Sequence, residues 1–242
     1  MAMKLYDGGR APNPRRVRIF LAEKGVSVPT EQVDLGTLQH RTAGFAAINP
    51  MQRLPALVLD DGTAIAESIA ICRYFEALYP DPPLFGRGAL NCALVEMWNR
   101  RVEFHLFFPV ATVFQHLHPA MKVMVDPQVP AWGEANKPRI FDFLKFLDGE
   151  LAQRTHVAGE AFSVADITAL VAVDFMKVSK LAVPDELTKC GAGTTPSARA
   201  RAPRRNKEPV IPAERTREPE SITTPPPPHC VWSSSPAARG RK

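Results

Sequence analysis

The spacing of apolar and polar residues changes repeatedly over the first part of the chain. Residues 4–6 predict a short strand almost at the terminus. Pro14 then suits the first turn of a helix, because apolar residues follow it at the i, i+3, i+4 spacing of one helix face, and Gly25 is a suitable end for that helix. A second strand is expected near residues 31–35, followed by a short helix over residues 40–48.

The next stretch has the pattern of a β-hairpin followed by a helix. Apolar runs at residues 55–59 and 63–66 flank a glycine-containing turn at residues 60–62. A helical stripe then extends over residues 67–78. The order strand, helix, strand, helix, hairpin and helix favours a mixed four-stranded sheet covered by helices.

From residue 87 on, the pattern contains only helical stretches, after a proline-rich linker at residues 81–86. Long helices are predicted at residues 87–117, 133–154 and 163–180. Ser163 and Asp166 have the spacing of a capping box, in which the two side chains satisfy backbone N–H groups of the first helical turn. Residues 167–175 are apolar nearly all round, so we expect this helix at the buried centre of an all-helical domain.

The net charge of +5 is unevenly distributed along the chain. Residues 189–242 carry eleven Lys or Arg and four Asp or Glu, whereas residues 1–188 carry 19 basic and 21 acidic side chains. The body therefore carries no signal for a polyanionic partner. A nucleic-acid role for the basic tail is not favoured, because Trp232 is its only aromatic residue suited to stacking on a base.

The tail after residue 188 also differs from the body in composition. Ten of the 24 prolines lie in residues 189–242 and apolar residues are sparse, so we predict a disordered segment. One possible nucleotide sequence for residues 193–201 encodes a different peptide when it is read in a frame that starts one base earlier. That peptide, Trp-Tyr-Asp-Ala-Val-Ser-Ala-Arg-Pro, has the pattern of a helix end. We therefore hypothesise a shifted reading frame near residues 188–193, with a natural basic tail as the alternative. The nucleotide sequence of this region distinguishes the two.

The four cysteines are scattered and show no spacing typical of a metal site. Cys72 and Cys92 lie in apolar helical context, where small buried thiols are expected. The sequence has neither a signal-peptide pattern nor an apolar run of about 18 residues. We therefore expect a cytoplasmic protein with no membrane partner and no bound metal.

Several short motifs occur in a fixed order: Arg-Arg-Val-Arg-Ile-Phe-Leu-Ala-Glu-Lys-Gly at 15–25, Ile-Asn-Pro at 48–50, Arg-Leu-Pro at 53–55, Glu-Ser at 67–68 and Ser-x-x-Asp at 163–166. In this order and spacing the chain resembles the cytosolic glutathione transferase family over roughly three quarters of its length, from residue 4 to about residue 184. The resemblance implies a thioredoxin-like glutathione-binding domain over residues 1–80, a linker at 81–86 and an all-helical domain over 87–188 that is incomplete if the frame is shifted.

The resemblance also assigns a site for glutathione as co-substrate. It implies a cis peptide bond between Leu54 and Pro55, beside which the cysteinyl unit of glutathione would pair like a short antiparallel strand. The Ser68 hydroxyl and N–H, at a helix N-terminus, would hold the γ-glutamyl carboxylate, and Glu67 would face its ammonium. For Glu67 and Ser68 the alternative is a capping role alone.

Basic residues are implied for the other end of glutathione. His40 and the neighbouring Arg41 lie where related enzymes hold the glycyl carboxylate, and Arg53 belongs to the same binding segment as Leu54. The alternative for His40 is an ordinary surface histidine.

The residue that would stabilise the glutathione thiolate is the least conventional part of the pattern. A free thiol has a pKa of about 8.5, so hydrogen bonds aimed at the sulfur are needed to ionise it near neutral pH. Family members place Ser, Tyr or Cys in this loop, whereas this chain has Ala11-Pro12-Asn13, as in a bacterial-type branch of the family. The Asn13 amide can donate to sulfur but cannot take its proton. Tyr6 on the first strand is the rival for this role.

The electrophile side is expected on the first helix of the second domain, with most of its stripe in the core and one or two residues facing the substrate. That stripe consists of Met97, Arg101, Phe104, His105 and Phe108. The function that follows is an enzyme, a glutathione S-transferase that transfers the thiolate to a small hydrophobic electrophile or a mixed disulfide and works as a homodimer. The alternatives are a glutathione-fold binding or regulatory module with weak catalysis and an inactive frameshifted product.

Overall fold

The computed structural model describes residues 2–191 of the 242-residue chain. Its first part contains a four-stranded sheet in the order β2-β1-β3-β4. The strands are β1 (Lys4–Asp7), β2 (Thr30–Gln32), β3 (Ala56–Val58) and β4 (Ala64–Ala66). Strand β1 is parallel to β2 and antiparallel to β3, and β3 and β4 form an antiparallel hairpin. This is the mixed sheet that the sequence predicts.

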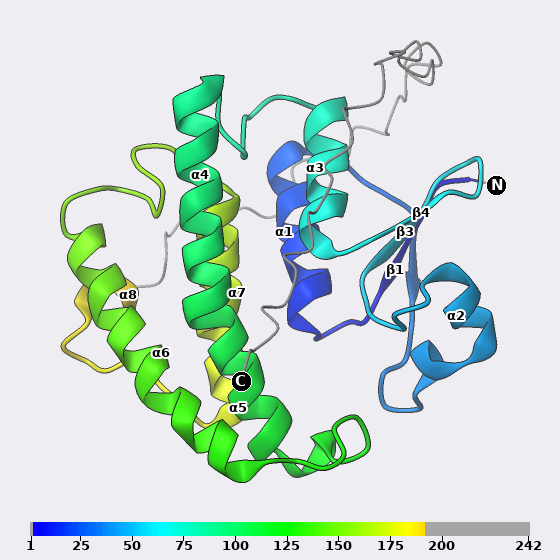
Figure 1. Cartoon of the computed structure of the whole chain (residues 1–242). Coiled ribbons are helices and arrows are strands. Elements are labelled where there is room, and N and C mark those ends of the chain that lie inside the picture. The colour runs from blue at the N-terminus through cyan, green and yellow to red at the C-terminus, as the bar shows by residue number, and fades with distance from the viewer. Residues whose placement is uncertain (1, 192–242) are drawn as a thin grey trace, which may run out of the picture. The chain divides into compact units, whose positions relative to one another are not determined.

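Helices cover both faces of the sheet, as Figure 1 shows. The helices α1 (Pro12–Lys24) and α3 (Ser68–Leu78) pack together on one face, while the 3-10 helix η1 (Gln39–Arg41) and α2 (Ala43–Ile48) lie on the other. Successive strand side chains point to opposite faces, so Leu5 is buried beneath α1 and α3 whereas Tyr6 packs against Phe45 of α2. Helix α1 ends at Gly25, whose φ of 66° is the left-handed conformation that glycine adopts without steric cost.

The second part is all-helical, as predicted. Its elements are α4 (Gly88–Val102), the π-helical turn η2 (Glu103–Phe107), α5 (Phe108–Leu117), the 3-10 turn η3 (Pro119–Met121), α6 (Pro130–Leu151), α7 (Val164–Met176), the 3-10 turn η4 (Lys177–Ser179) and α8 (Thr188–Gly191). Ten of the 13 residues of α7 are buried, and this helix packs against α1, α4, α5 and η2. The apolar run at 167–175 therefore marks the centre of the helical part, and the predicted fold class, a thioredoxin-like part followed by an all-helical part, is confirmed.

Helix α7 begins with the predicted capping box, formed by Ser163 and Asp166. The Asp166 carboxylate accepts hydrogen bonds from the Ser163 N–H and hydroxyl, both at 2.9 Å, and from the Val157 N–H at 2.8 Å. Both side chains are buried and therefore lose their hydrogen bonds to water on folding. The hydrogen bonds of the capping box compensate for that loss.

Polar contacts join the first part to the helical part. The N–H of Val164, the first residue of α7, donates at 2.9 Å to the carbonyl of Leu84, which lies in the segment between the two parts. Arg15 on α1 donates to Asp174 of α7 at 2.7 Å. The start of α1, where Asn13 lies, is therefore held against the helical part.

Two predictions need comment here. Cys72 is buried as expected, but the prediction for Cys92 is wrong: the first turns of α4, residues 88–94, all face outward, and Cys92 is exposed with them. The disordered tail and the shifted frame concern residues 189–242, of which the structure describes only 189–191, so both lie outside the described residues apart from that end. The domain boundaries stay predictions. No helix within residues 2–191 is both long and apolar enough to cross a membrane.

Candidate active site

Three segments of the first part meet at one end of the sheet. Continuing the antiparallel register of β1 with β3 by two residues brings Gly8 opposite Leu54, and β4 ends at Ala66, opposite Ala56 of β3 and two residues before Ser68. A Cβ atom on Gly8 would lie 3.0 Å from Leu54 Cδ1 and 3.4 Å from Ala11 Cβ, so the loop before α1 touches Leu54. The sheet therefore gathers the loop that leads to Asn13, the segment around Leu54 and the start of α3.

The segment around Leu54 presents free backbone groups. The Leu54-Pro55 peptide bond is cis, as predicted, and the Leu54 backbone makes no hydrogen bond to another described residue. The loop before it is fixed by the buried Asn49, whose Nδ2 donates to the Arg53 carbonyl at 2.8 Å and whose Oδ1 accepts from the Met51 N–H at 3.1 Å. An extended ligand could therefore pair with Leu54 without displacing a hydrogen bond of the protein.

The start of α3 leaves its donors open. Glu67 is the N-cap residue, with a φ of 70° and a ψ of 122° that are unusual for any residue except glycine. No side chain caps this helix, and its first backbone bond runs from the Ile71 N–H to the Glu67 carbonyl at 3.0 Å. The N–H groups of Ser68, Ile69 and Ala70 consequently lack partners within the helix. Free N–H groups and the helix dipole together favour a carboxylate at this point.

The start of α1 concentrates its donors at one residue. Pro12 and Pro14 have no N–H, and the Arg15 N–H is bonded to the Ala11 carbonyl at 3.3 Å. The backbone N–H of Asn13 is therefore the donor that the first turn leaves open, next to the Asn13 side-chain amide. The positive end of the α1 dipole acts at the same place.

A buried arginine connects Asn13 to the helical part. Arg16 is 2 % exposed, and its Nη1 donates to Asn13 Oδ1 at 3.3 Å and to Glu103 Oε1 at 3.0 Å. Its Nη2 donates to the Thr168 hydroxyl at 3.0 Å, and its guanidinium lies 5.1 Å from the centre of the Phe107 ring. Burial lowers the pKa of Arg16, and the Glu103 charge and hydrogen bond oppose that shift. An arginine in such surroundings keeps its proton.

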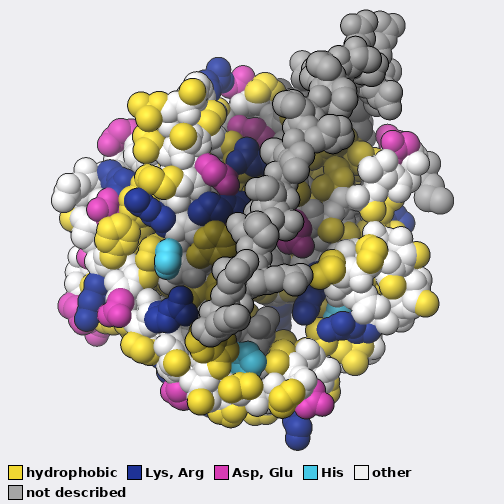
Figure 2. All heavy atoms as spheres, viewed as in Figure 1, with side chains coloured by type: hydrophobic (Ala, Val, Ile, Leu, Met, Phe, Trp, Pro, Cys, Tyr) yellow, Lys and Arg dark blue, Asp and Glu magenta, His cyan; other side chains and the backbone are white. Residues whose placement is uncertain are grey.

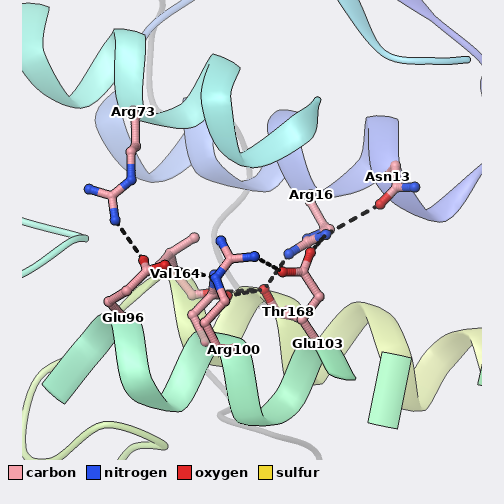
Figure 3. A network of polar contacts seen from close by, with 9 residues as sticks. Asn13, Arg16, Arg73, Glu96, Arg100, Glu103, Val164 and Thr168 are labelled. Atoms are coloured by element: carbon pink, nitrogen blue, oxygen red, sulfur yellow. Dashed lines mark hydrogen bonds and ion pairs between the residues drawn. The ribbon is translucent and has the colours of Figure 1, made fainter. Parts of the chain in front are cut away.

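The same contacts continue as a chain of alternating charges, drawn in Figure 3. Glu103 also accepts from Arg100, Arg100 Nε donates to Glu96 at 2.7 Å, and Glu96 accepts from Arg73 of α3 at 2.6 Å. The chain begins at the buried Arg16 on α1 and ends at the half-exposed Arg73, and Glu103 stands in the π-helical turn η2, a kind of turn common at functional sites. It links both helices of the candidate site, α1 and α3, to α4 and η2.

A basic group lies on the α2 side of the site. His40 is 2 % exposed, so it is not the surface histidine of the alternative, and both of its ring nitrogens are buried without a hydrogen-bond partner. Burial lowers the pKa of His40, and the positive charges of Arg41 and Arg53 lower it further. Arg41 is steadied by Gln52, whose Oε1 accepts from Arg41 Nη1 at 3.2 Å. Figure 2 shows Lys and Arg side chains at several places on the visible face, interspersed with hydrophobic ones.

Tyr6 and Asn13 lie on different sides of the sheet. The Tyr6 ring meets the Phe45 ring edge-on at 6.0 Å and packs against the cluster of Val33, Phe45 and Ala56. Asn13 begins α1, which covers the opposite face. The Asn13 amide also has a bond that fixes it, to Arg16.

The buried protein thiols are poor rivals for a glutathione thiolate. Burial raises the pKa of the Cys72 thiol to about 12, and burial together with Asp148 raises that of Cys190 to about 12. Thiols with such values stay protonated at neutral pH. Among residues 2–191, no group of His, Cys, Asp and Glu side chains is arranged to hold a metal ion.

The prediction that most of the residues expected to line the electrophile side are buried in the core is wrong. None of the five residues is in the core: Phe104, His105 and Phe108 are exposed, and Met97 and Arg101 are half-buried. The core face of this helical stretch is the neighbouring one, which carries Val95, Trp98, Asn99, Val102, Leu106 and Val110. Met97 and Arg101 already lie off the buried face in α4, before the π-helical turn, because helical spacing alone does not say which face of a helix has a partner.

The structure thus brings Asn13, Leu54 and Ser68 to one end of the sheet, with Glu67 adjacent, and groups His40 with Arg41 and Arg53. Sequence reasoning missed the three residues that connect this end to the helical part, namely Arg16, Glu103 and Thr168. A signal for Arg16 was present: three arginines fall within one turn of α1, and one of them must face its buried side.

The comparisons with known proteins agree with this arrangement. A family model described as "Glutathione S-transferase, N-terminal domain" matches residues 11–78, and one described as "Glutathione S-transferase, C-terminal domain" matches residues 115–190. Glutathione S-transferase 2 of Saccharomyces cerevisiae is 38% identical over 187 residues, which cover 76% of this chain and 80% of that protein. The chain belongs to the glutathione S-transferase family. Its predicted nature as an enzyme, a glutathione transferase, is confirmed with it.

Solved structures of the family are similar as well. The crystal structure of Gtt2 from Saccharomyces cerevisiae matches with a TM-score of 0.76 and 35% identity, over 81% of this chain and 98% of that one. A glutathione S-transferase domain-containing protein of Marinobacter aquaeolei VT8 matches with a TM-score of 0.75 and 37% identity, over 78% of this chain and 94% of that one.

Proposed function

We propose that this glutathione S-transferase family member binds glutathione across the end of the sheet, ionises its thiol beside Asn13 and transfers the sulfur to an electrophile. The thiol proton leaves to solvent, because Asn13 cannot accept it. The thiolate then forms a bond to an electrophilic carbon, whose leaving group departs with its electron pair. With a mixed disulfide, the thiolate instead bonds to one sulfur and releases the other as a thiolate.

The binding half of the proposal rests on the open polar groups of the described structure. The Leu54 backbone is free to pair with the cysteinyl unit, as one strand pairs with another. The unpartnered N–H groups and the Ser68 hydroxyl at the start of α3 would receive the γ-glutamyl carboxylate, with the exposed Glu67 carboxylate near its ammonium. Arg53 would supply the positive charge for the glycyl carboxylate, and the His40 ring would donate the hydrogen bond for which it lacks a partner.

The activation half is carried by a single observation: Asn13 combines a free backbone N–H, a side-chain amide and the positive end of α1. Lowering the thiol pKa by one unit takes about 1.4 kcal/mol of preferential stabilisation of the thiolate, which is the order of one charge-assisted hydrogen bond. Tyr6 packs on the opposite face, which favours Asn13 for this role.

For the electrophile, we infer an apolar surface at η2 and the start of α5. Phe104 and Phe108 are 56% and 53% exposed; Phe104 follows Glu103, which contacts Arg16, and Phe108 begins α5 directly after this turn. Exposed aromatic side chains near the sulfur suit a small hydrophobic substrate.

The experiment is a titration of bound glutathione by the ultraviolet absorbance of its thiolate, in the wild type and in Asn13→Ala. We expect the midpoint to rise by about one pH unit in Asn13→Ala and to stay unchanged in the control Asn91→Ala, whose side chain accepts from the Arg87 N–H far along the chain. An unchanged midpoint in Asn13→Ala removes Asn13 from the mechanism.

Assays of glutathione binding, of turnover and of aggregation in the wild type distinguish the alternatives. Binding of glutathione without turnover on any chlorinated aromatic or disulfide substrate would favour a binding or regulatory module. A protein that neither binds glutathione nor remains monodisperse would point to an inactive product of a shifted frame.

We also infer a homodimer. Leu90 on α4 and Met51 in the loop before β3 are 74% and 69% exposed, and such apolar side chains gain free energy when a second subunit covers them. Light scattering of the wild type and of Leu90→Asp measures the subunit number, and a monomeric wild type would contradict the inference.

A further inference from the structure

We propose that Arg16 is a positioning residue of the active site, which fixes the Asn13 side-chain amide so that its NH2 group faces the glutathione sulfur. The helical part of the protein holds Arg16 in that position. The inference rests on the proposed role of Asn13 and adds to it a specific cause for the amide's orientation.

The first step concerns which atom of Asn13 meets which partner. An arginine side chain has donors only, so the atom that Arg16 Nη1 contacts at 3.3 Å must be the Asn13 oxygen. The amide is planar, and an oxygen turned inward to Arg16 leaves the NH2 group on the other side. An amide free to rotate would present its oxygen to the sulfur for part of the time, and an oxygen repels a thiolate.

The second step concerns what holds Arg16. Its side chain lies along the interface between α1 and the helical part, where Glu103 and Thr168 accept its hydrogen bonds at 3.0 Å each. The Phe107 ring covers the guanidinium at 5.1 Å. A planar guanidinium that donates from two of its nitrogens to fixed acceptors is held in one orientation. The ammonium group of a lysine, on a shorter side chain, cannot make the same set of hydrogen bonds. Figure 3 shows Asn13 and Glu103 reached from the same guanidinium.

The third step separates position from charge. Glu103 balances the charge of Arg16, and the ion pairs continue through Arg100 to Glu96. A cation whose charge is neutralised by Glu103 contributes little field at the sulfur, whereas its hydrogen bond to Asn13 acts directly on the donor that faces the sulfur. A substitution that keeps the charge but loses the fork geometry should therefore impair the site.

The test is a double-mutant cycle of Arg16→Lys and Asn13→Ala, read by the thiolate titration midpoint of bound glutathione. Arg16→Lys is expected to raise the midpoint by about 0.5–1 pH unit in the wild-type background, a three- to tenfold loss of thiolate near neutral pH. Glutathione affinity should change less than about twofold. In the Asn13→Ala background Arg16→Lys should leave the midpoint unchanged, because its effect passes through the amide.

The matched control is Arg15→Lys. Arg15 is the neighbouring residue on α1 and also bridges to the helical part, but its side-chain hydrogen bond goes to Asp174 and not to Asn13. Its replacement should leave the midpoint where it is. An equal shift in Arg15→Lys would mean that any loosening of the interface acts on the thiol, and would overturn the specific role of Arg16.

Other outcomes are equally decisive. No shift in Arg16→Lys, or the same shift with and without Asn13, overturns the proposal while leaving Asn13 in place. No shift in Asn13→Ala shows instead that the proposed function has failed at its sulfur contact. If Arg16→Lys does not fold, Thr168→Val replaces it in the cycle, since it removes one acceptor of Arg16 and nearly conserves side-chain shape. The same criteria then apply.

Discussion

Two kinds of helix start occur in this molecule. At the start of α7 the Asp166 carboxylate receives three hydrogen bonds from Ser163 and Val157, all within a buried capping box. At the starts of α1 and α3 no side chain caps the helix, and backbone N–H groups are left open. The closed start lies inside the helical part, and the open starts lie together at the end of the sheet.

The difference arises from a shift of one residue. Ser163 is the N-cap of α7, with extended backbone angles, so its side chain can turn back over the first turn. Ser68 is the first residue inside α3, and the N-cap position is taken by Glu67 with a positive φ. The same residue type therefore closes one helix and leaves the other able to receive an anion. Uncapped donors at a buried or half-buried helix start indicate a ligand more strongly than the identity of the serine does.

The largest effect is expected on stability, when the capping box at the start of α7 is removed. Asp166→Ala removes three hydrogen bonds to a buried carboxylate and leaves the donors of Ser163 and Val157 without partners. We expect a loss of about 3 kcal/mol in the free energy of unfolding, measured by urea denaturation. The exposed Asp142→Ala serves as control and should stay within about 0.5 kcal/mol of the wild type. A loss below about 1 kcal/mol in Asp166→Ala would show that the box contributes little.

The two serines test the comparison directly. Ser68→Ala should weaken glutathione binding about tenfold, or about 1.4 kcal/mol, and should leave stability within about 0.5 kcal/mol, because Ser68 caps nothing. Ser163→Ala should do the reverse, with a loss of about 1 kcal/mol in stability and unchanged affinity. Calorimetric titration with glutathione and urea unfolding measure the two quantities on both variants. Equal stability losses in the two variants would abolish the distinction.

The strained residue at the open start offers a finer test. Glycine adopts the φ of 70° found at Glu67 without steric cost, so Glu67→Gly should raise the free energy of unfolding by about 1 kcal/mol. It should also weaken glutathione binding about threefold through loss of the carboxylate. Glu67→Gln retains the strain and removes only the charge, so it should lose affinity without gaining stability. Equal stability of the glycine and glutamine variants would show that the backbone is relaxed there.

The sequence predicts most of the fold because its signals are local. The helical spacing before Gly25, the hairpin before Glu67 and the box at Ser163 each depend on residues close together in the chain, and the structure contains the elements they predict. The site residues Asn13, Leu54 and Ser68 came from ordered motifs, and the pairing of β1, β3 and β4 explains why the segments that carry them lie at one end of the sheet.

What the sequence could not supply depends on contacts across the chain. Arg16 and Thr168 are 152 positions apart, and neither residue's own neighbours indicate the bond between them. The stripe with Phe104 and Phe108 was assigned to the core, but the buried residues Trp98, Val102 and Leu106 follow the same helical spacing on the neighbouring face. The prediction that Cys92 is buried was wrong for a similar reason, because apolar neighbours in the sequence do not say which face of α4 packs against another element.

The smallest expected effect concerns His40, a buried polar group that is left open like the donors of α3. Burial and the nearby Arg41 and Arg53 lower its pKa in the folded protein, so the unfolded chain binds the proton more readily. Stability should therefore fall as the pH drops below about 6.5, by at most about 1.4 kcal/mol per pH unit, and His40→Gln should remove that slope. The control variant His105→Gln, at an exposed position, should retain the pH dependence of stability.

Bound glutathione, with a carboxylate beside His40, should raise the pKa of His40 again. Proton uptake should therefore accompany binding, which calorimetry in buffers of different ionisation enthalpy measures. Binding of glutathione without proton uptake would show that the glycyl carboxylate lies elsewhere.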